Sequence, residues 1–264
     1  MQLGVIGLGH VGAALAADLE ALGHAVVSYD IRTDDPYPRA ALAECRYTFI
    51  CVNTPMGEDG SADVTAVRAS VAELPSTTTP VLRSTVPPGT SSALQREHGR
   101  PVLHWPEYVG ETTFGSQTWE PLRAGSTFLI VGGDHDEAAR FADAMIGMYG
   151  PQVRVHLVTS EESELIKYME NCYLALKVSF VNDFYRLCRQ MGADWHAVRE
   201  GWLLDPRVER DHTAVFPSNP GYSGKCLPKD VSALRQFAAS QGITLPTVEG
   251  TMRANELAQE ATNE

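Results

Sequence analysis

The sequence Leu3-Gly-Val-Ile-Gly-Leu-Gly-His-Val-Gly12 predicts how the first half of the chain folds. Its short apolar run is typical of a buried strand, and a helical pattern follows to about residue 22. Gly7 permits a tight turn, Gly9 permits close approach of a pyrophosphate to the backbone, and Gly12 permits the helix to pack on the strand. This arrangement predicts a dinucleotide-binding turn.

A second apolar run ends in Asp30, eighteen residues after Gly12. An acid at this place accepts a hydrogen bond from the ribose 2′-OH and repels a 2′-phosphate, so the sequence predicts NAD rather than NADP. Arg32 lies close by and weakens that preference slightly. His10 and Val11, inside the turn, complete the predicted contacts to the cofactor. The alternative is a glycine-rich turn that binds no nucleotide.

Strand-like and helix-like segments alternate along the rest of the first half. Apolar runs typical of strands occupy residues 48–52, 81–83, 102–104, 128–131 and 153–155. Helical patterns occupy residues 64–74, 90–98 and 137–148. The alternation predicts an α/β fold with a Rossmann-type, doubly wound parallel sheet over residues 1–158, whose ligands bind at the carboxyl ends of the strands.

Three loops follow predicted strands, at residues 53–56, 84–90 and 105–111. Each loop alone is typical of a turn or a helix cap, because Pro and Gly interrupt helices and strands and hydroxyls cap helices. Three such loops on one predicted edge favour a binding site. Glu107 and Glu111 in the third loop are candidate acid–base groups.

A long helical pattern opens the second half. Thr159-Ser-Glu-Glu162 matches a capping box, and the pattern continues without Pro or Gly to about Met191. A broad apolar stripe is typical of a helix buried on more than one side, which predicts a homodimer through residues 159–191. The stripe comprises Leu165, Ile166, Tyr168, Met169, Leu174, Ala175, Val178, Phe180, Val181 and Phe184.

The same helix carries Glu164, Lys167 and Asn171 at positions i, i+3 and i+7, so they share one face. The spacing fits a functional face and equally an exposed Glu–Lys pair. Further helical patterns occupy residues 195–203 and most residues from 231 onward. The sequence therefore predicts an all-α domain over residues 159–264 with one long central helix.

The segment Gly221-Tyr-Ser-Gly-Lys-Cys-Leu-Pro-Lys-Asp230 places a thiol between two ammonium groups. Pro228 is favoured in a first helical turn, so Cys226 is expected just before a helix N-terminus. The positive end of the helix dipole, Lys225 and Lys229 then favour the thiolate. The alternative is a buried, inert cysteine. Two further side chains in the preceding loop, Arg207 and Arg210, are candidate phosphate contacts or solvated groups.

Composition limits the remaining possibilities. The 264 residues are enough for two domains, and a net charge of −12 argues against nucleic-acid binding. The chain contains no run of eighteen apolar residues, so the sequence predicts no membrane span. The N-terminus lacks the basic region of a signal peptide. Five scattered cysteines have no metal-ligand spacing and suit free thiols in a reducing compartment, so we expect a cytoplasmic protein without a metal.

Six segments together resemble the UDP-glucose/GDP-mannose dehydrogenase family. They are GVIGLGHVG, CVNTP followed by DGSADVTAV, STVPPGT, PEYVGE, SELIKYMEN and GYSGKCLPKD, in the family's order. The resemblance implies an NAD-dependent enzyme that oxidises the C6 alcohol of a nucleotide sugar to the uronic acid. In the family, the cysteine attacks the aldehyde formed by the first hydride transfer, the second transfer gives a thioester, and water hydrolyses it.

The resemblance also implies roles for individual residues. Cys226 matches the nucleophile, Lys167 and Asn171 match residues at the reacting oxygen, Asp230 matches the acid that orders a water, and Glu107 matches the acid implicated in hydrolysis. The implied cofactor contacts are Gly7, Gly9, His10, Val11, Gly12, Asp30, Arg32, Thr54, Thr85 and Lys229. The implied substrate contacts are Tyr108, Glu111, Lys167, Asn171, Gly221, Tyr222 and Gly224.

The chain departs from the family pattern in three places. It ends near where a third, C-terminal domain that binds the sugar nucleotide usually follows, which predicts a short form, natural or truncated. The stretch between Asp30 and Tyr47 is short, and Ser223 replaces a usual Gly. Two alternatives stay open: a single-hydride dehydrogenase of the β-hydroxyacid type, which leaves Cys226 unexplained, and a non-catalytic NAD-binding dimer.

Overall fold

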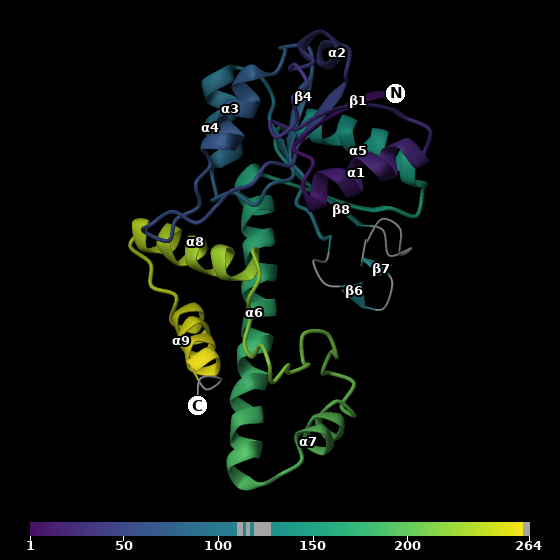
Figure 1. Cartoon of the computed structure of the whole chain (residues 1–264). Helices are drawn as coiled ribbons and strands as arrows, with labels where there is room; N and C mark the ends of the chain where they lie inside the picture. Colours follow the sequence, from purple (N-terminus) through teal and green to yellow (C-terminus); the bar gives the residue numbers. More distant parts are fainter. Residues whose placement is uncertain (110–112, 115–116, 119–127, 261–264) are drawn as a thin grey trace. The chain divides into compact units, whose positions relative to one another are not determined.

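The computed structural model describes residues 1–109, 113–114, 117–118 and 128–260 (Figure 1). The chain forms two compact units, the first made of Met1–Pro55 and Ala62–Lys167 and the second of Met56–Ser61 and Tyr168–Glu264. Helix α6 (Ser160–Met191) contributes residues to both. A domain boundary at residue 158 stays a prediction.

A sheet of seven strands, in the part of the chain that the structure describes, is the centre of the first unit. Its order is β2-β1-β3-β4-β5-β8-β9. The strands are β1 (Gln2–Ile6), β2 (Ala25–Tyr29), β3 (Tyr47–Ile50), β4 (Thr79–Leu82), β5 (Leu103–His104), β8 (Phe128–Gly132) and β9 (Arg154–Val158). All the neighbours pair in parallel except β5 and β8. The Rossmann-type α/β fold predicted from the sequence is therefore confirmed.

The antiparallel pair of β5 and β8 is the one departure from an all-parallel sheet. A parallel strand requires a crossover, usually a helix, to return the chain to the same end of the sheet. Between these strands the described residues contain only the short hairpin of β6 (Thr113–Phe114) and β7 (Gln117–Thr118). Those described residues contain no helix, and β8 runs opposite to β5.

Helices cover both faces of the sheet (Figure 1). On one face lie α1 (His10–Ala21) and α5 (His135–Tyr149), and on the other α2 (Arg39–Ala43), α3 (Thr65–Glu73) and α4 (Thr90–His98). Successive strand residues point to opposite faces and join separate cores. Val5, Phe49 and Val81 pack with α1 and α5, whereas Ile6, Ile50 and Leu82 pack with the other helices.

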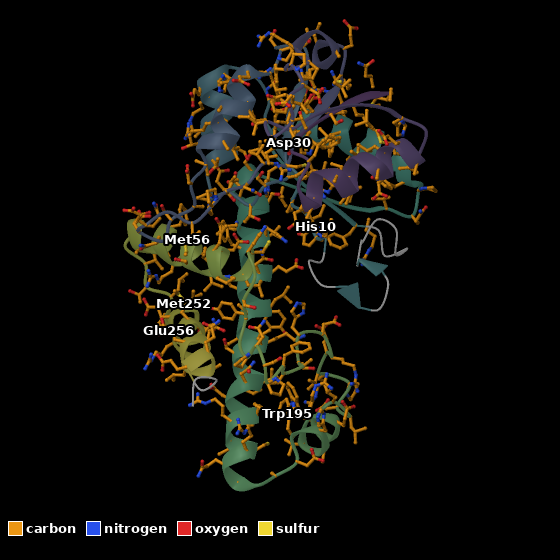
Figure 2. The ribbon with its side chains drawn as sticks, viewed as in Figure 1. His10, Asp30, Met56, Trp195, Met252 and Glu256 are labelled. Carbon is orange, nitrogen blue, oxygen red and sulfur yellow. The ribbon has the colours of Figure 1, made fainter. Side chains whose placement is uncertain are left out.

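The second unit is helical. Beside the greater part of α6 it contains α7 (Trp195–Trp202), α8 (Leu227–Ser240) and α9 (Pro246–Glu260). Ala175 of α6, Val231 of α8 and Met252 of α9 pack together, and Trp195 at the start of α7 packs in a second cluster (Figure 2). The predicted helices are confirmed, and α8 begins earlier than residue 231 because Pro228 lies within its first turn.

A short segment of the second unit, residues 56–61, comes from the connection between β3 and α3. Ser232 Oγ of α8 donates a hydrogen bond of 2.9 Å to Gly60 O. Gln236 of the same helix donates to Asp59 O. The segment is therefore tied to α8, the helix that follows Cys226.

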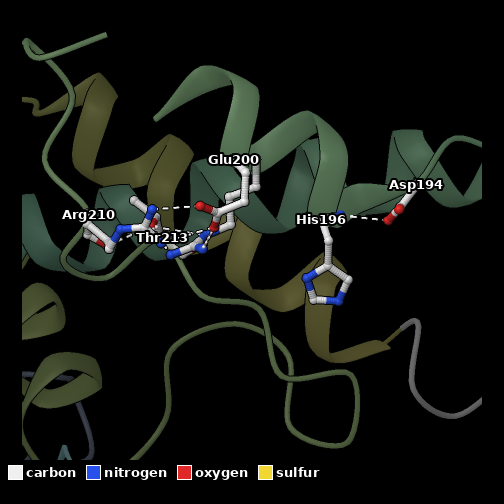
Figure 3. A network of polar contacts seen from close by, with 6 residues as sticks. Asp194, His196, Glu200, Arg210 and Thr213 are labelled. Carbon is white, nitrogen blue, oxygen red and sulfur yellow. Dashed lines mark hydrogen bonds and ion pairs between the residues drawn. The ribbon is translucent and has the colours of Figure 1, made fainter. Parts of the chain in front are cut away.

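The loop after α7 is held to that helix by a polar network (Figure 3). Arg199 donates to Thr213 O at 2.8 Å, and Arg210 pairs with Glu200 at 2.6 Å. Arg207 pairs with Asp205 at 2.6 Å. Both arginines that the sequence offered as phosphate contacts thus form ion pairs within their own unit.

The capping box predicted at the start of α6 is confirmed. Thr159 N donates to Glu162 Oε2 at 2.8 Å, and Glu162 N donates to Thr159 Oγ1 at 3.3 Å. Among the described residues, no helix combines the length and the apolar character that crossing a membrane requires.

Candidate active site

The glycine turn has the geometry that a dinucleotide needs. Gly7 has a φ of +89°, which favours glycine, and a Cβ on Gly12 would lie 1.8 Å from Gly7 O. A Cβ on Gly9 would meet nothing within 4 Å, so a ligand can approach the backbone there. Helix α1 begins at His10 and directs its N-terminus toward this opening, as phosphate binding requires. The residues present fit a pyrophosphate.

Asp30 lies directly after β2 and is buried (Figure 2). Its carboxylate accepts hydrogen bonds from Leu8 N at 2.7 Å and from Arg32 N and Nε at 2.9 and 2.8 Å. The bonds from Arg32 hold the pKa of Asp30 well below its ordinary value, so the carboxylate is ionised and can accept from a ribose hydroxyl. Arg32 is largely exposed, so it can move aside from an incoming ribose.

Thr54 and Thr85 lie after β3 and β4, at the carboxyl ends of neighbouring strands. Both are buried, and Thr54 Oγ1 donates to Thr85 O at 2.8 Å. This bond joins two of the three loops that the sequence placed at one edge of the sheet. The cofactor roles of these threonines stay predictions.

The third loop and α6 bring Glu107 and Lys167 together in the first unit. Glu107 Oε1 lies 3.4 Å from Lys167 Nζ, and Lys167 is only 5% exposed. Its Nζ lies 4.9 Å from the ring centroid of Tyr108, over the aromatic face. Glu107 Oε2 accepts from Val109 N at 2.9 Å. The alternative of an exposed Glu–Lys pair on this helix is therefore wrong.

Glu164, one turn before Lys167, ties α6 to the start of α4. Its carboxylate accepts from Gly89 N at 2.5 Å, Ser91 N at 2.8 Å and Ser91 Oγ at 2.6 Å. Burial raises the pKa of Glu164 to about 7, although these hydrogen bonds act in the opposite direction. Glu164 thus fixes the position of the helix that carries Lys167.

Asn171 and Asp230 form a buried pair in the second unit. Asn171 Nδ2 donates to Asp230 Oδ2 at 2.6 Å, and Lys229 Nζ contacts Asp230 Oδ1. Asp230 lies in the first turn of α8, where the positive end of the helix dipole favours a carboxylate. The pair connects α6 to α8.

Cys226 is the N-cap residue of α8 and is partly exposed, with Pro228 in the first turn. The structure therefore confirms its expected place just before a helix N-terminus. Gly221 and Gly224 lie in the loop that leads to it. Tyr222 is buried beside Ala175 and Val231, and its N–H donates to Asn255 Oδ1 at 2.6 Å.

Several of these assignments stay predictions. The structure does not test the substrate roles of Tyr108, Gly221, Tyr222 and Gly224, nor the cofactor roles of Val11 and Lys229. Glu111 lies outside the described residues.

Two buried residues beside Glu107 were given no role from the sequence. Arg83 is 4% exposed and its Nη1 donates to Trp105 O and Pro106 O. His104 is fully buried, its Nδ1 lies 2.8 Å from Ser163 Oγ, and burial lowers its pKa to about 3, so it is neutral. The available signal for Arg83 is a charged residue at the end of the strand-like run 81–83.

The glycine turn, the ionised acid after the second strand and the mostly parallel sheet define a dinucleotide-binding protein of the Rossmann type. Residues 37–150 match the NAD binding domain of the UDP-glucose/GDP-mannose dehydrogenase family, and residues 161–257 match its central domain. The chain belongs to this family, and NAD is the cofactor of its first unit.

Individual relatives agree with this assignment. The chain is 33% identical over 231 residues to UDP-glucose 6-dehydrogenase TuaD of Bacillus subtilis, covering 82% of this chain and 48% of TuaD. A UDP-glucose dehydrogenase structure from Pyrobaculum islandicum is 28% identical with a TM-score of 0.82, covering 97% of this chain and 68% of that one. The chain thus spans about half the length of TuaD.

A third protein shares the fold alone. The structure of 3-hydroxyisobutyrate dehydrogenase from Mycobacterium tuberculosis superposes with a TM-score of 0.70 at 18% identity, covering 100% of this chain and 94% of that one. It shows that this architecture also occurs in a dehydrogenase of similar length.

Proposed function

We propose that the protein oxidises the C6 alcohol of a nucleotide sugar to the uronic acid, with two NAD reduced per sugar, through a thioester on Cys226. The family and the relatives named UDP-glucose 6-dehydrogenase support the substrate class. The observation that carries the proposal is Cys226 at the N-terminus of α8. A dehydrogenase that transfers a single hydride has no need of a nucleophile there.

Bound NAD supplies the hydride acceptor for both oxidations. The glycine turn and the ionised Asp30 are the groups that would hold it. The remaining chemistry falls to side chains of this chain.

Cys226 is the proposed nucleophile. The helix dipole and the neighbouring lysines favour its thiolate, which attacks the C6 aldehyde so that a C–S bond forms and the carbonyl electrons move to oxygen. Lys167 is the proposed cation that stabilises this oxygen, and its burial makes its charge more effective than in water. Loss of the C6 hydride from this oxyanion, with its electrons on oxygen re-forming the C=O bond, then leaves the thioester.

Hydrolysis regenerates the thiolate. Asp230, fixed by Asn171 and Lys229, is proposed to order the attacking water. Glu107, beside Lys167, is proposed to accept a proton from that water. The water oxygen bonds to the acyl carbon, the C–S bond breaks with its electrons going to sulfur, and the uronate leaves.

The test is the number of NADH formed per sugar nucleotide consumed, with UDP-glucose and with GDP-mannose. The wild type is expected to give two, whereas Cys226→Ser gives no free uronate. Cys45→Ser replaces a buried free cysteine in the first unit; it is the control for loss of a thiol and should still give two NADH per sugar. One NADH per sugar, unaffected by Cys226→Ser, would support the single-hydride alternative. NAD binding without turnover on either sugar would support the non-catalytic one.

We further propose that the partner is a second copy of the chain, bound through the exposed apolar side chains of α6. Leu165, Met169, Phe180 and Phe184 of the predicted stripe are exposed in the single chain. Exposed apolar side chains along one helix are typical of an interface.

The proposed location is the cytoplasm, because all five cysteines are free thiols and the chemistry requires one of them to stay reduced. Appearance of the protein in an oxidising compartment would contradict this.

A further inference from the structure

We infer that Arg83 is a positioning residue for Glu107, a role that the family resemblance did not assign. The inference rests on the proposed function, in which Glu107 acts in thioester hydrolysis. Arg83 is a buried cation to which the proposed chemistry gives no role.

Arg83 itself is rigidly placed. It follows β4 directly, and its N–H donates to Ile50 O at 2.9 Å, so the sheet ladder continues to this residue. Its side chain is only 4% exposed. Burial of a guanidinium costs free energy unless its donors are satisfied, so the contacts it makes are informative.

Those contacts go to the two peptide units before Glu107. Arg83 Nη1 donates to Trp105 O at 3.2 Å and to Pro106 O at 3.1 Å. The guanidinium carbon lies 3.8 Å from the centroid of the Trp105 ring, a cation–π contact. One side chain therefore holds both carbonyls of the residues immediately before Glu107 and also contacts the Trp105 ring.

The Trp105 ring also packs against Phe49 and Phe141 in the core, whereas Pro106 lacks one kind of anchor. Pro106 has no N–H, so it cannot hold the loop by donating a backbone hydrogen bond. Trp105 N donates to Leu82 O at 2.9 Å, which anchors the start of the loop. Arg83 anchors the next step, and Glu107 then reaches Lys167 at 3.4 Å. The position of the Glu107 carboxylate thus depends on Arg83.

The chemistry of the side chain makes the idea testable. A planar guanidinium can stack on an aromatic ring while donating in its own plane, whereas an ammonium is a compact point charge. A methionine would fill similar space and donate nothing. Arg83→Lys should therefore preserve part of the function, and Arg83→Met should lose it.

The kinetic arm follows product formation and the acyl-enzyme. We expect Arg83→Met to lower kcat by ~10- to 100-fold, because a displacement of the order of 1 Å has effects of this size. The KM for the sugar nucleotide should change less than about twofold, since a positioning effect falls on the reacting step. The thioester on Cys226 should accumulate after an acid quench and be visible by intact mass spectrometry. Arg83→Lys should fall between.

A double-mutant cycle separates positioning from general destabilisation. In a Glu107→Gln background, Arg83→Met should cause no further loss of kcat, because its effect acts through Glu107. Leu94→Ala, a fully buried core change in α4, is the control that lowers stability without touching the loop. It should not cause acyl-enzyme to accumulate. An additive loss from Arg83→Met in the Glu107→Gln background would overturn the inference.

A hydrogen-exchange experiment tests the placement of the loop without requiring turnover. Hydrogen exchange of the peptide covering residues 104–109 should be faster in Arg83→Met than in the wild type, and unchanged in Leu94→Ala beyond its global effect. If the wild type oxidises neither sugar, the proposed function fails and this arm alone decides the placement of the loop. Unchanged exchange in Arg83→Met would overturn the inference in either case.

Discussion

The inner, buried face and the outer, exposed face of α6 each depart in part from those of an ordinary surface helix. The inner face buries apolar side chains such as Ala175 and Val181, but it buries polar ones as well. The inner face carries Ser163, Glu164, Lys167 and Asn171, all at most 5% exposed. The outer face carries apolar side chains that include Met169, which is 75% exposed. A surface helix of a globular protein usually exposes its polar side chains and keeps large apolar ones away from water.

The buried polar groups and the exposed apolar groups of α6 indicate a separate role for each face. Buried polar groups cost free energy unless they are paired, and those of the inner face have partners within their own units. Exposed apolar groups gain nothing until something covers them. The inner face therefore fits chemistry, and the outer face fits a partner. Four changes test this comparison.

The largest effect is expected on the inner face. Lys167→Met removes the buried cation that the mechanism assigns to the developing oxyanion, so kcat should fall by about 10²- to 10³-fold. Lys177→Met is the control, because Lys177 lies on the same helix and its partner is the exposed Glu209. Steady-state NADH formation measures both. Equal losses in the two variants would mean that the inner face has no special role.

A substitution on the outer face of α6 should weaken dimerisation and leave the catalytic rate unchanged. The rings of Phe180 and Phe184 pack at a tilt with centroids 4.9 Å apart, and Phe184→Asp would bury an unpaired carboxylate in the proposed interface. The dimer dissociation constant should rise by about 30-fold or more, the equivalent of about 2 kcal/mol. Sedimentation equilibrium measures it, with the exposed Asp183→Asn as control. A monomeric wild type at micromolar concentration would contradict the proposed partner.

A pH dependence is expected where the inner face meets β5. The pKa of His104 is lowered from 6.5 to about 3, so the folded state holds it neutral while the unfolded state takes up a proton below pH 6.5. Its stabilising contribution is complete above pH 6.5 and is lost as the pH falls toward 3. The loss amounts to about 2 kcal/mol by pH 5, because one pKa unit corresponds to about 1.4 kcal/mol.

Urea unfolding of the wild type and of His104→Gln, each at pH 7.5 and pH 5, measures this effect. The variant should be less stable at pH 7.5 and should lose less on acidification. An equal loss in both proteins would assign the pH dependence to other groups.

The smallest effect is expected for a substitution at the N-terminus of α6. Thr159→Ala removes the side-chain half of the capping box, which should cost about 1 kcal/mol of unfolding free energy with kcat unchanged. Glu161→Gln is the comparison, because the Glu161 side chain makes neither capping hydrogen bond and a glutamine oxygen can still accept from Ser92 Oγ. A loss of activity larger than the loss of stability would mean that the helix start influences the inner face directly.

Sequence patterns predicted those parts of the molecule that local rules control. The glycine turn, the capping box and the helix that starts after Cys226 each follow from neighbouring residues. The antiparallel β8 did not follow, because strand direction depends on the path between strands. The short helix α2 has only five residues and too weak a pattern to detect.

The same limit applies to the site. Lys167 and Asn171 could be placed on one face by spacing, but their burial and partners depend on distant residues such as Asp230. Neighbouring residues in the sequence give no indication of a role for Arg83 or His104. Their roles depend on the loop and the helix that they contact. The periodicity of a sequence does not predict which distant segments come into contact.

The tie between residues 56–61 and α8 has a consequence for synthesis of the protein. Gly60 and Ser232 are separated by 172 positions, so the ribosome makes one partner long before the other. At typical elongation rates of about 5–20 residues per second, α8 is synthesised roughly ten seconds or more after residues 56–61. During that time the first unit can fold with this loop unclamped. A nascent chain stalled before α8 should therefore show protease cleavage within residues 56–61 that the released protein resists.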